Sequence, residues 1–312
     1  MLYQMTKSGA TIDQILYLKP ISGLNQNLSN MDRVPIVFIQ DLFKNLTVFK
    51  AVTEFARLPR NYGLCAKELE EKGHNKYLVL KNGSFDKVCF FDNKYNIIEA
   101  DTQLFCPKFR TGKYVCFIDD NEDDLHENDC STNHLDEFLK ESGMLSLQIE
   151  SSSFNSKWVE TCSAWRSLQQ VYVSIKLNES VLQLLNNLLN QEQLLCLRVP
   201  GDYDGVEEVE LCSAFLQQKQ FQGLRFSVWN EAAKNQLMLV ASKNTDEFLG
   251  KTITWFCKAT LHNDSFACVK CIQEGWISYR KGNVLVAYYS DTLNATAEEF
   301  MEDVVQCEIL FV

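Results

Sequence analysis

The sequence predicts an α/β fold in which strand-helix repeats form a solenoid, preceded by a short three-helix module and flanked by antiparallel strands. A short apolar pattern recurs four times between residues 144 and 226, and segments with helical spacing separate its copies. Alternating apolar residues lie before and after this region. With 312 residues, 46% of them hydrophobic, the chain is long enough for one large domain or two ordinary ones.

Residues 1–30 are polar and rich in Asn and Ser, and we expect them to form a flexible extension. Residues 31–73 predict three short helices, since Pro35 stands where the first would begin and Pro59 and Gly73 would end the second and third. The apolar residues of the first helix recur at the spacing of one amphipathic face: Ile36, Phe38, Ile39, Leu42, Phe43 and Leu46.

Residues 74–118 predict a region of antiparallel strands. Short alternating runs are separated there by the turn pairs Asn82-Gly83 and Asp92-Asn93. Residues 119–134 follow as a strongly acidic segment, which we interpret as a solvated loop that divides the chain.

Residues 135–250 contain the repeats. The pattern is a large apolar residue, two residues, an apolar residue, one residue and another apolar residue, and its middle position falls at Leu147, Val171, Leu197 and Leu224. The steps of 24, 26 and 27 residues are within the range of leucine-rich repeats, although no unit has the asparagine that usually follows the strand of such a repeat. An ordinary doubly wound sheet is the alternative, because it also alternates strands and helices.

Two segments between these strands have clear helical spacing. One runs from Asn178, a good N-cap residue, to Gln193, and the other from Val206 to Gln220. Residues 251–312 return to strand-like alternation, which predicts an antiparallel cap and a terminal helix over residues 296–305. We expect the apolar end of the chain to pack or pair.

The net charge of −11 argues against nucleic acid and membrane partners, because it repels polyphosphate backbones and anionic lipids. A protein partner is therefore expected. We find neither a signal peptide nor an apolar run of about 20 residues, and this predicts a cytoplasmic or nuclear protein. Most of the twelve cysteines stand in apolar segments and are interpreted as reduced thiols, but six Asn-x-Ser/Thr triplets leave a secreted protein as an alternative.

Motifs that carry chemistry are few. A weak zinc candidate consists of Cys257, His262, Cys268 and Cys271, and it lacks the second Cys-x-x-Cys of a zinc ribbon. The sequence has no phosphate-binding loop, no dinucleotide fingerprint and no nucleophile elbow. We therefore expect a protein without enzymatic activity or a cofactor.

The segments 31–43 and 55–66 resemble the opening of nematode F-box and F-box-like proteins. The resemblance implies that a three-helix F-box docks on the Skp-family adaptor of a cullin ubiquitin ligase while the repeats hold the substrate. No tryptophan follows Cys65, where an F-box usually has one. The residues that this resemblance assigns to adaptor binding are Val34, Pro35, Phe38, Leu42 and Leu46.

Two functions are expected from these features. The first is a substrate-recognition subunit of a cullin ubiquitin ligase, and the second is a stand-alone repeat scaffold or inhibitor that binds a protein ligand, with the helices merely capping the domain. In both, the ligand would contact the outward residues between the core-facing positions of each strand: Gln148, Tyr172, Arg198 and Arg225.

Overall fold

The computed structural model describes residues 35–46, 56, 58, 60–93, 96–98, 105–119, 132–200, 206–227, 235–239, 246–256, 261, 266–270, 275–290 and 296–312. They form a mixed α/β structure with a 13-stranded sheet, so the predicted α/β class is confirmed. The chain divides into two compact units, and each unit is assembled from three separate segments. Unit 1 consists of Met1–Val79, Phe85–Val115 and Asn128–Leu145, and unit 2 of Leu80–Ser84, Cys116–Glu127 and Ser146–Val312.

The N-terminal strands match the alternating runs predicted over residues 74–118. They are β1 (His74–Lys81), β2 (Ser84–Asp92), β3 (Ile97–Ile98) and β4 (Arg110–Ile118), in the order β4-β1-β2-β3. The turn between β1 and β2 is Asn82-Gly83, as predicted, and both residues have positive φ angles of 49° and 81°. In this order strand β4 lies beside β1 and not beside β3.

Two helices of unit 1 precede these strands. They are α2 (Ile36–Leu46) and α4 (Arg60–Lys72), and they correspond to the first and third predicted helices. Most of the predicted second helix lies outside the described residues. A small core holds α2 against α4, and the 3₁₀ turn Pro107–Phe109 adds one aromatic ring to it: Ile39, Cys65, Ala66, Leu69 and Phe109.

The C-terminal end of α4 is closed by Gly73 and Asn93. The Gly73 N–H and the Asn93 Nδ2 both donate to the Leu69 carbonyl oxygen at 2.8 Å, which satisfies a carbonyl that the helix leaves unpaired. A Cβ atom on Gly73 would lie 2.2 Å from Asn93 Nδ2. Only glycine fits between the helix end and this amide.

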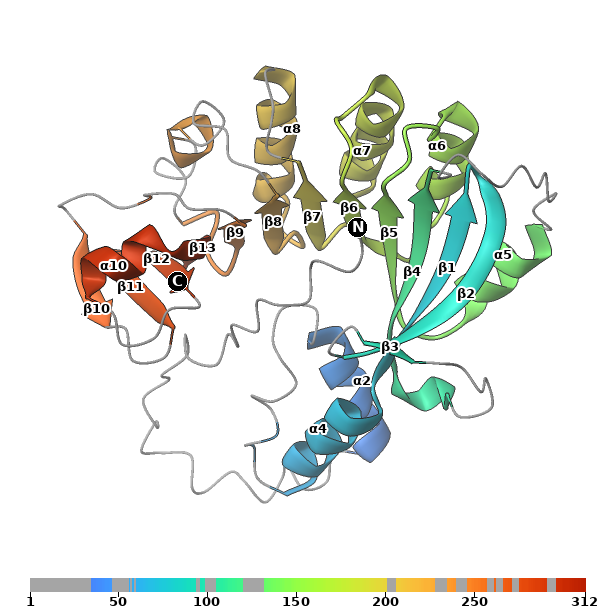
Figure 1. Ribbon diagram of the computed structural model, residues 1–312, viewed down its shortest axis with the longest axis horizontal. Coiled ribbons are helices and arrows are strands. Elements are labelled where there is room, and N and C mark those ends of the chain that lie inside the picture. Colours follow the sequence, from blue (N-terminus) through green and yellow to red (C-terminus); the bar gives the residue numbers. More distant parts are fainter. Residues whose placement is uncertain are drawn as a thin grey trace. The chain divides into compact units, whose positions relative to one another are not determined.

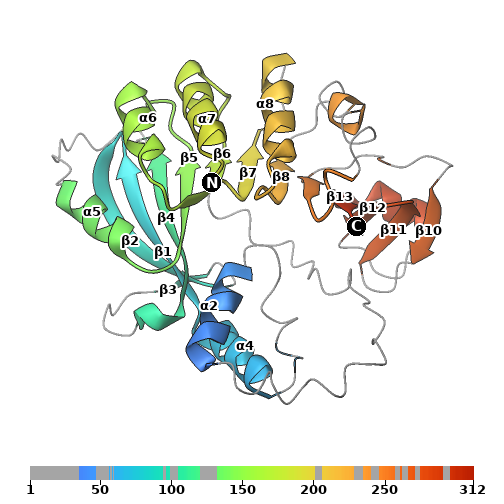
Figure 2. The same cartoon turned by 180° about the vertical axis from the view of Figure 1, so that it is seen from behind.

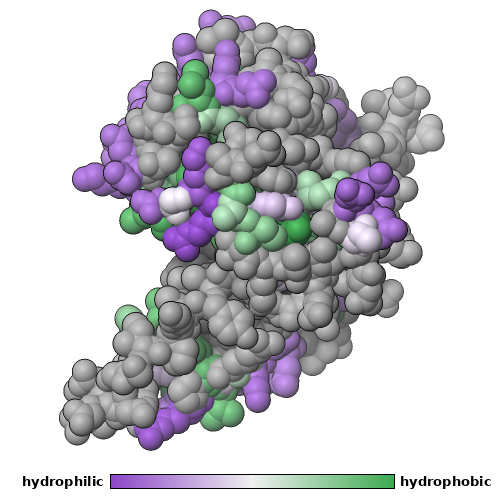
Figure 3. Space-filling view, turned by 90° about the vertical axis from the view of Figure 1, so that its left-hand side faces the viewer, coloured by the Kyte–Doolittle hydropathy of each residue, from purple (hydrophilic) through white to green (hydrophobic). Residues whose placement is uncertain are grey.

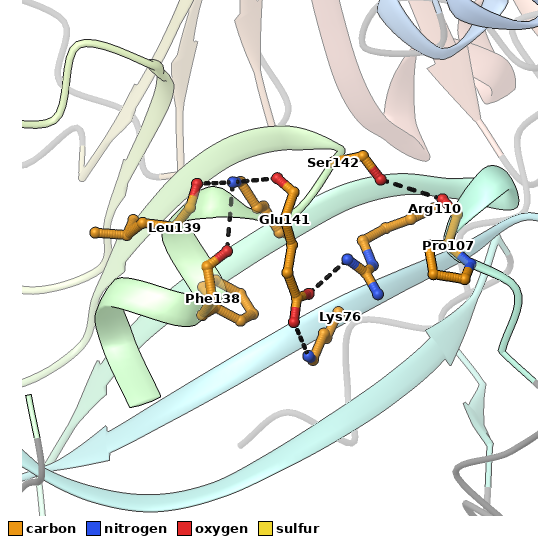
Figure 4. A network of polar contacts seen from close by, with 8 residues as sticks. Lys76, Pro107, Arg110, Phe138, Leu139, Glu141 and Ser142 are labelled. Carbon is orange, nitrogen blue, oxygen red and sulfur yellow. Dashed lines mark hydrogen bonds and ion pairs between the residues drawn. The ribbon is translucent and has the colours of Figure 1, made fainter. Parts of the chain in front are cut away.

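Helix α5 (Thr132–Lys140) begins inside the range 119–134 that was predicted as a loop, so the loop prediction is too long at its C-terminal end. Its end is held by a buried polar network (Figure 4). Lys113 of β4 is 2% exposed and donates to three carbonyls, those of Phe138 at 3.4 Å, Leu139 at 2.5 Å and Glu141 at 2.6 Å. The Glu141 carboxylate pairs with Lys76 at 2.7 Å and Arg110 at 2.5 Å.

The repeats of unit 2 form a stack of strands and helices. Its strands are β5 (Met144–Ile149), β6 (Leu168–Val173), β7 (Cys196–Val199), β8 (Gly223–Phe226) and β9 (Thr252–Trp255). The helices α6 (Ser156–Ser163), α7 (Glu179–Gln191) and α8 (Val206–Gln217) lie next to one another along this part of the sheet (Figures 1 and 2). The predicted N-cap of α7 is confirmed, since Asn178 Oδ1 accepts a hydrogen bond from the Val181 N–H at 2.9 Å.

The register of the parallel strands confirms the repeat pattern for three of its middle positions. Val171 pairs with Leu197, and Leu197 pairs with Leu224. These side chains are fully buried, so the alternation places the residue after each of them on the opposite face of the sheet.

Strand β9 is a correction to the prediction, which assigned it to the antiparallel cap. It pairs in parallel with β8, with Ile253 opposite Leu224, and so continues the stack. The repeat pattern did not predict this strand as a fifth unit, because Gly250 stands where the other units have a large apolar residue. Gly250 has a φ of +80°, a conformation that glycine adopts without strain.

Polar side chains contact the C-terminal ends of the helices in the stack. Just before each of three strands, a side chain donates to the C-terminal end of the helix in the preceding unit. Gln193 donates to the Trp165 carbonyl at 2.9 Å, Gln218 to that of Leu189 at 2.5 Å, and Lys251 to those of Leu216 and Gln218. Neighbouring units are thus joined by side-chain donors to carbonyls at or next to the helix ends.

The C-terminal strands are antiparallel, as predicted. They are β10 (Ala267–Lys270), β11 (Trp276–Lys281), β12 (Val284–Ser290) and β13 (Val304–Phe311), and β13 lies between β12 and β9. The predicted pairing of the chain end is confirmed. Helix α10 (Ala297–Glu302) starts at a Thr296 capping box and is shorter than predicted, because β13 begins at Val304.

Candidate protein-binding surfaces

Apolar side chains gather on the outside of α2 and α4. The exposed fractions are 50% for Ile36, 65% for Val37, 59% for Phe38, 38% for Leu42 and 65% for Leu64. Single apolar residues on a surface are normal, but five exposed ones on two packed helices make this helix pair a candidate for binding a partner. We call these five residues the α2–α4 apolar surface.

This surface contains two of the residues that the F-box resemblance assigns to adaptor binding, Phe38 and Leu42. Pro35 lies exposed at the start of the helix, Val34 lies outside the described residues, and Leu46 ends α2 without a described side chain.

The amphipathic helix predicted from these apolar residues is present as α2, but α4 covers only part of its apolar side. Of the apolar side chains described, only Ile39 is buried, and it packs against α4. Gln40 is buried beside it and donates to Glu68 Oε2 at 3.2 Å. A turn of about 100° per residue places Ile36, Phe38 and Leu42 on the same broad side of α2 as Ile39, yet these three side chains are exposed. More apolar area is therefore exposed than the packing of α2 requires.

The four residues predicted for the ligand-binding face are all half-buried, and the strand pairing aligns three of them. Tyr172 pairs with Arg198, Arg198 with Arg225, and Arg225 with Thr254 of β9. Thr254 in turn pairs with Glu308 of β13. We call these five residues the strand row. Gln148 of β5 is hydrogen-bonded to Glu150 and Cys116.

Contacts with neighbouring side chains fix the orientation of the strand row. Arg198 Nε donates to Ser227 Oγ at 3.1 Å, and its guanidinium lies 4.6 Å from the centre of the Phe256 ring, a cation–π arrangement. The Tyr172 hydroxyl donates to Gln170 Oε1 at 2.6 Å. Ordered arginine and tyrosine side chains are typical of binding surfaces.

Glu308 closes one end of the row, and sequence reasoning missed it because it lies in the C-terminal strands. Thr254 Oγ1 donates to its carboxyl group at 3.2 Å and the Tyr289 hydroxyl does so at 3.3 Å. Burial raises the pKa of Glu308, and the positive charge of Arg225 opposes that change. Only the pairing of β13 with β9 brings this carboxyl group to the row.

Replacing Glu308 with glutamine should stabilise the protein relative to the natural chain as the pH rises from about 4 to about 7. Because the pKa of Glu308 is raised in the folded state, its contribution to the free energy of unfolding is fully present below its pKa in the unfolded chain, about 4.3. That contribution is lost as the pH rises through the pKa of the folded state. Glutamine has no proton to lose. Urea unfolding of both proteins at the two pH values measures the difference, and an equal difference at both would contradict the prediction.

Little in the described residues points to metal or thiol chemistry. Of the weak zinc candidate, Cys268 is exposed in β10, and Cys257, His262 and Cys271 lie outside the described residues. No group of three metal-ligating residues gathers within the described ranges. Burial raises the pKa of Cys162 and Cys196, and it raises the pKa of Cys212 to about 12, so these thiols stay protonated at neutral pH.

The face of the molecule that carries the C-terminal strands is mixed in hydropathy (Figure 3). Among its coloured residues, hydrophobic and hydrophilic ones lie next to one another (Figure 3). Within the part of the chain that is described, no helix has both the length and the apolar character that crossing a bilayer requires.

Comparisons with models of known protein families, with curated protein sequences and with solved structures found no significant match for this chain.

Proposed function

We propose that this chain is a non-enzymatic protein-recognition subunit, which binds a partner protein on its strand row and presents it to a cullin ubiquitin ligase. In this proposal the α2–α4 apolar surface docks on a Skp-family adaptor, as the resemblance of residues 31–43 and 55–66 to F-box proteins implies. The repeats form a leucine-rich-repeat-like solenoid that carries the ligand.

The observation that carries the proposal is the exposure of Phe38 and Leu42 together with Ile36, Val37 and Leu64. Burying such side chains against a partner is favourable by about 25 cal/mol for each Å² of apolar surface removed from water. Ile39, between these exposed side chains on α2, is buried and already contacts α4. The helix pair can therefore bind a partner without losing its own core.

Changing Phe38 and Leu42 to aspartate together should lower adaptor recovery at least about tenfold, because each change places a carboxylate in an apolar contact. Purified full-length chain would be immobilised and incubated with a purified Skp-family adaptor. The matched control changes two exposed apolar residues elsewhere to aspartate, Leu249 and Val312, which are 59% and 42% exposed. The control should recover the adaptor like the natural chain.

Equal recovery by both double variants would place the contact elsewhere. If the natural chain recovers no adaptor, the second function is favoured, a stand-alone scaffold or inhibitor. That function has its own support, because Gln170 and Ser227, which order Tyr172 and Arg198, belong to the stack of strands and helices itself.

A further inference from the structure

We propose that the strand row binds an acidic segment of the partner protein, with one carboxylate held between Arg198 and Arg225. This inference rests on the proposed protein-recognition function and names the chemistry of the ligand.

The strand pairing brings the two arginines together. Arg198 and Arg225 are direct partners on the adjacent parallel strands β7 and β8, and neighbouring strands lie about 4.8 Å apart. Two guanidinium groups at this spacing can both reach one carboxylate, and each can donate charge-assisted hydrogen bonds to it.

The arginine site is ordered before a ligand arrives. The Ser227 hydroxyl and the Phe256 ring hold the Arg198 guanidinium, and Gln170 holds the hydroxyl of Tyr172 beside it. Gln170 is itself 2% exposed and accepts a hydrogen bond from Ser146 at 3.0 Å. Side chains that are already fixed lose less conformational entropy when they bind.

The surrounding charge limits the ligand to a short acidic segment. A net charge of −11 repels long polyanions, whereas a single carboxylate next to a local pair of arginines is attracted. We expect an acidic residue of this segment to lie over the two arginines.

The test uses a fluorescein-labelled decapeptide of alternating glycine and glutamate, and a second peptide with glutamine in place of glutamate. Fluorescence anisotropy with the full chain at low salt should detect binding of the first peptide and much weaker binding of the second. Arg198→Gln with Arg225→Gln should weaken binding at least about tenfold, since two charge-assisted contacts are lost. The control Lys157→Gln with Arg166→Gln removes the same charge from exposed positions and should stay within about twofold.

Equal weakening by both double variants, or equal binding of both peptides, would overturn the inference. A third variant, Arg198→Lys with Arg225→Lys, separates folding from recognition. It keeps the charges but loses the planar donors, so its affinity should fall between those of the natural chain and the glutamine variant. The Phe38→Asp and Leu42→Asp variant should bind the acidic peptide normally. Failure of adaptor docking is thereby distinguished from failure of the strand row.

Discussion

Replacing Leu197 with alanine should lower the free energy of unfolding by about 3 kcal/mol. Leu197 is fully buried and lies between Val171 and Leu224 in the register of the parallel strands. Removing three carbon atoms there leaves a cavity in the row of side chains that packs between the sheet and its helices. Urea unfolding followed by circular dichroism measures the loss as a shift of the midpoint.

The matched control is Leu249→Ala, at a leucine that is 59% exposed, and its effect should stay within about 0.5 kcal/mol. A shift for Leu197→Ala no larger than that of the control would mean that the aligned apolar positions do not form a packed core.

Leu197 also shows how much of the fold the sequence predicts. Two apolar residues spaced by two must lie on the same face of a strand, so repeating that spacing aligns the strands as well as locating them. The predicted partners Val171, Leu197 and Leu224 are the observed ones. Strand β9 was not predicted as part of the repeats, because a single glycine, Gly250, replaces the first apolar residue of the pattern. Ile253 and Trp255 match its other two positions.

Features that depend on distant segments had no local signal. The insertion of β13 between β12 and β9 is decided by packing over more than 50 residues of sequence. The donors Gln193, Gln218 and Lys251 stand in polar connections, where glutamine and lysine are ordinary surface residues. Their role becomes visible only when the end of the neighbouring helix is placed beside them.

The candidate binding surfaces, too, could be predicted from the sequence only in part. Alternation along the strands predicted that Tyr172, Arg198 and Arg225 face away from the apolar positions, and the register then added Thr254 and Glu308 from outside the predicted repeats. For α2, both the helix and its apolar side were predicted, but not which part of that side α4 covers. Composition alone could not decide that Ile39 is buried and that Phe38 is 59% exposed.

Replacing Lys113 with methionine should destabilise the protein by about 2 kcal/mol, although the change removes a buried charge. Methionine preserves the length of the apolar stem but cannot donate to the carbonyls of Phe138, Leu139 and Glu141. The Phe138 carbonyl keeps the Glu141 N–H at 3.2 Å, so the loss falls on the carbonyls of Leu139 and Glu141. Each buried acceptor that loses its partner costs about 1–3 kcal/mol, and together these costs exceed the gain from no longer burying an ammonium group. Thermal unfolding measures the change.

The control is Lys87→Met, at a lysine of β2 whose side chain is 64% exposed, and it should change stability by less than about 0.5 kcal/mol. An equally small effect at Lys113 would mean that water or a shift of α5 satisfies the carbonyls.

The stability difference between the natural chain and Lys113→Met should also depend on pH. Burial lowers the pKa of Lys113, so between that value and the unfolded value of about 10.4 the unfolded chain binds more protons than the folded one. The contribution of Lys113 to stability is therefore greatest above the unfolded value and decreases as the pH falls through the folded value. Unfolding measured at about pH 8 and about pH 10 should show a larger deficit for the methionine variant at the higher pH, because the desolvation cost of the ammonium group is then relieved in the natural chain alone.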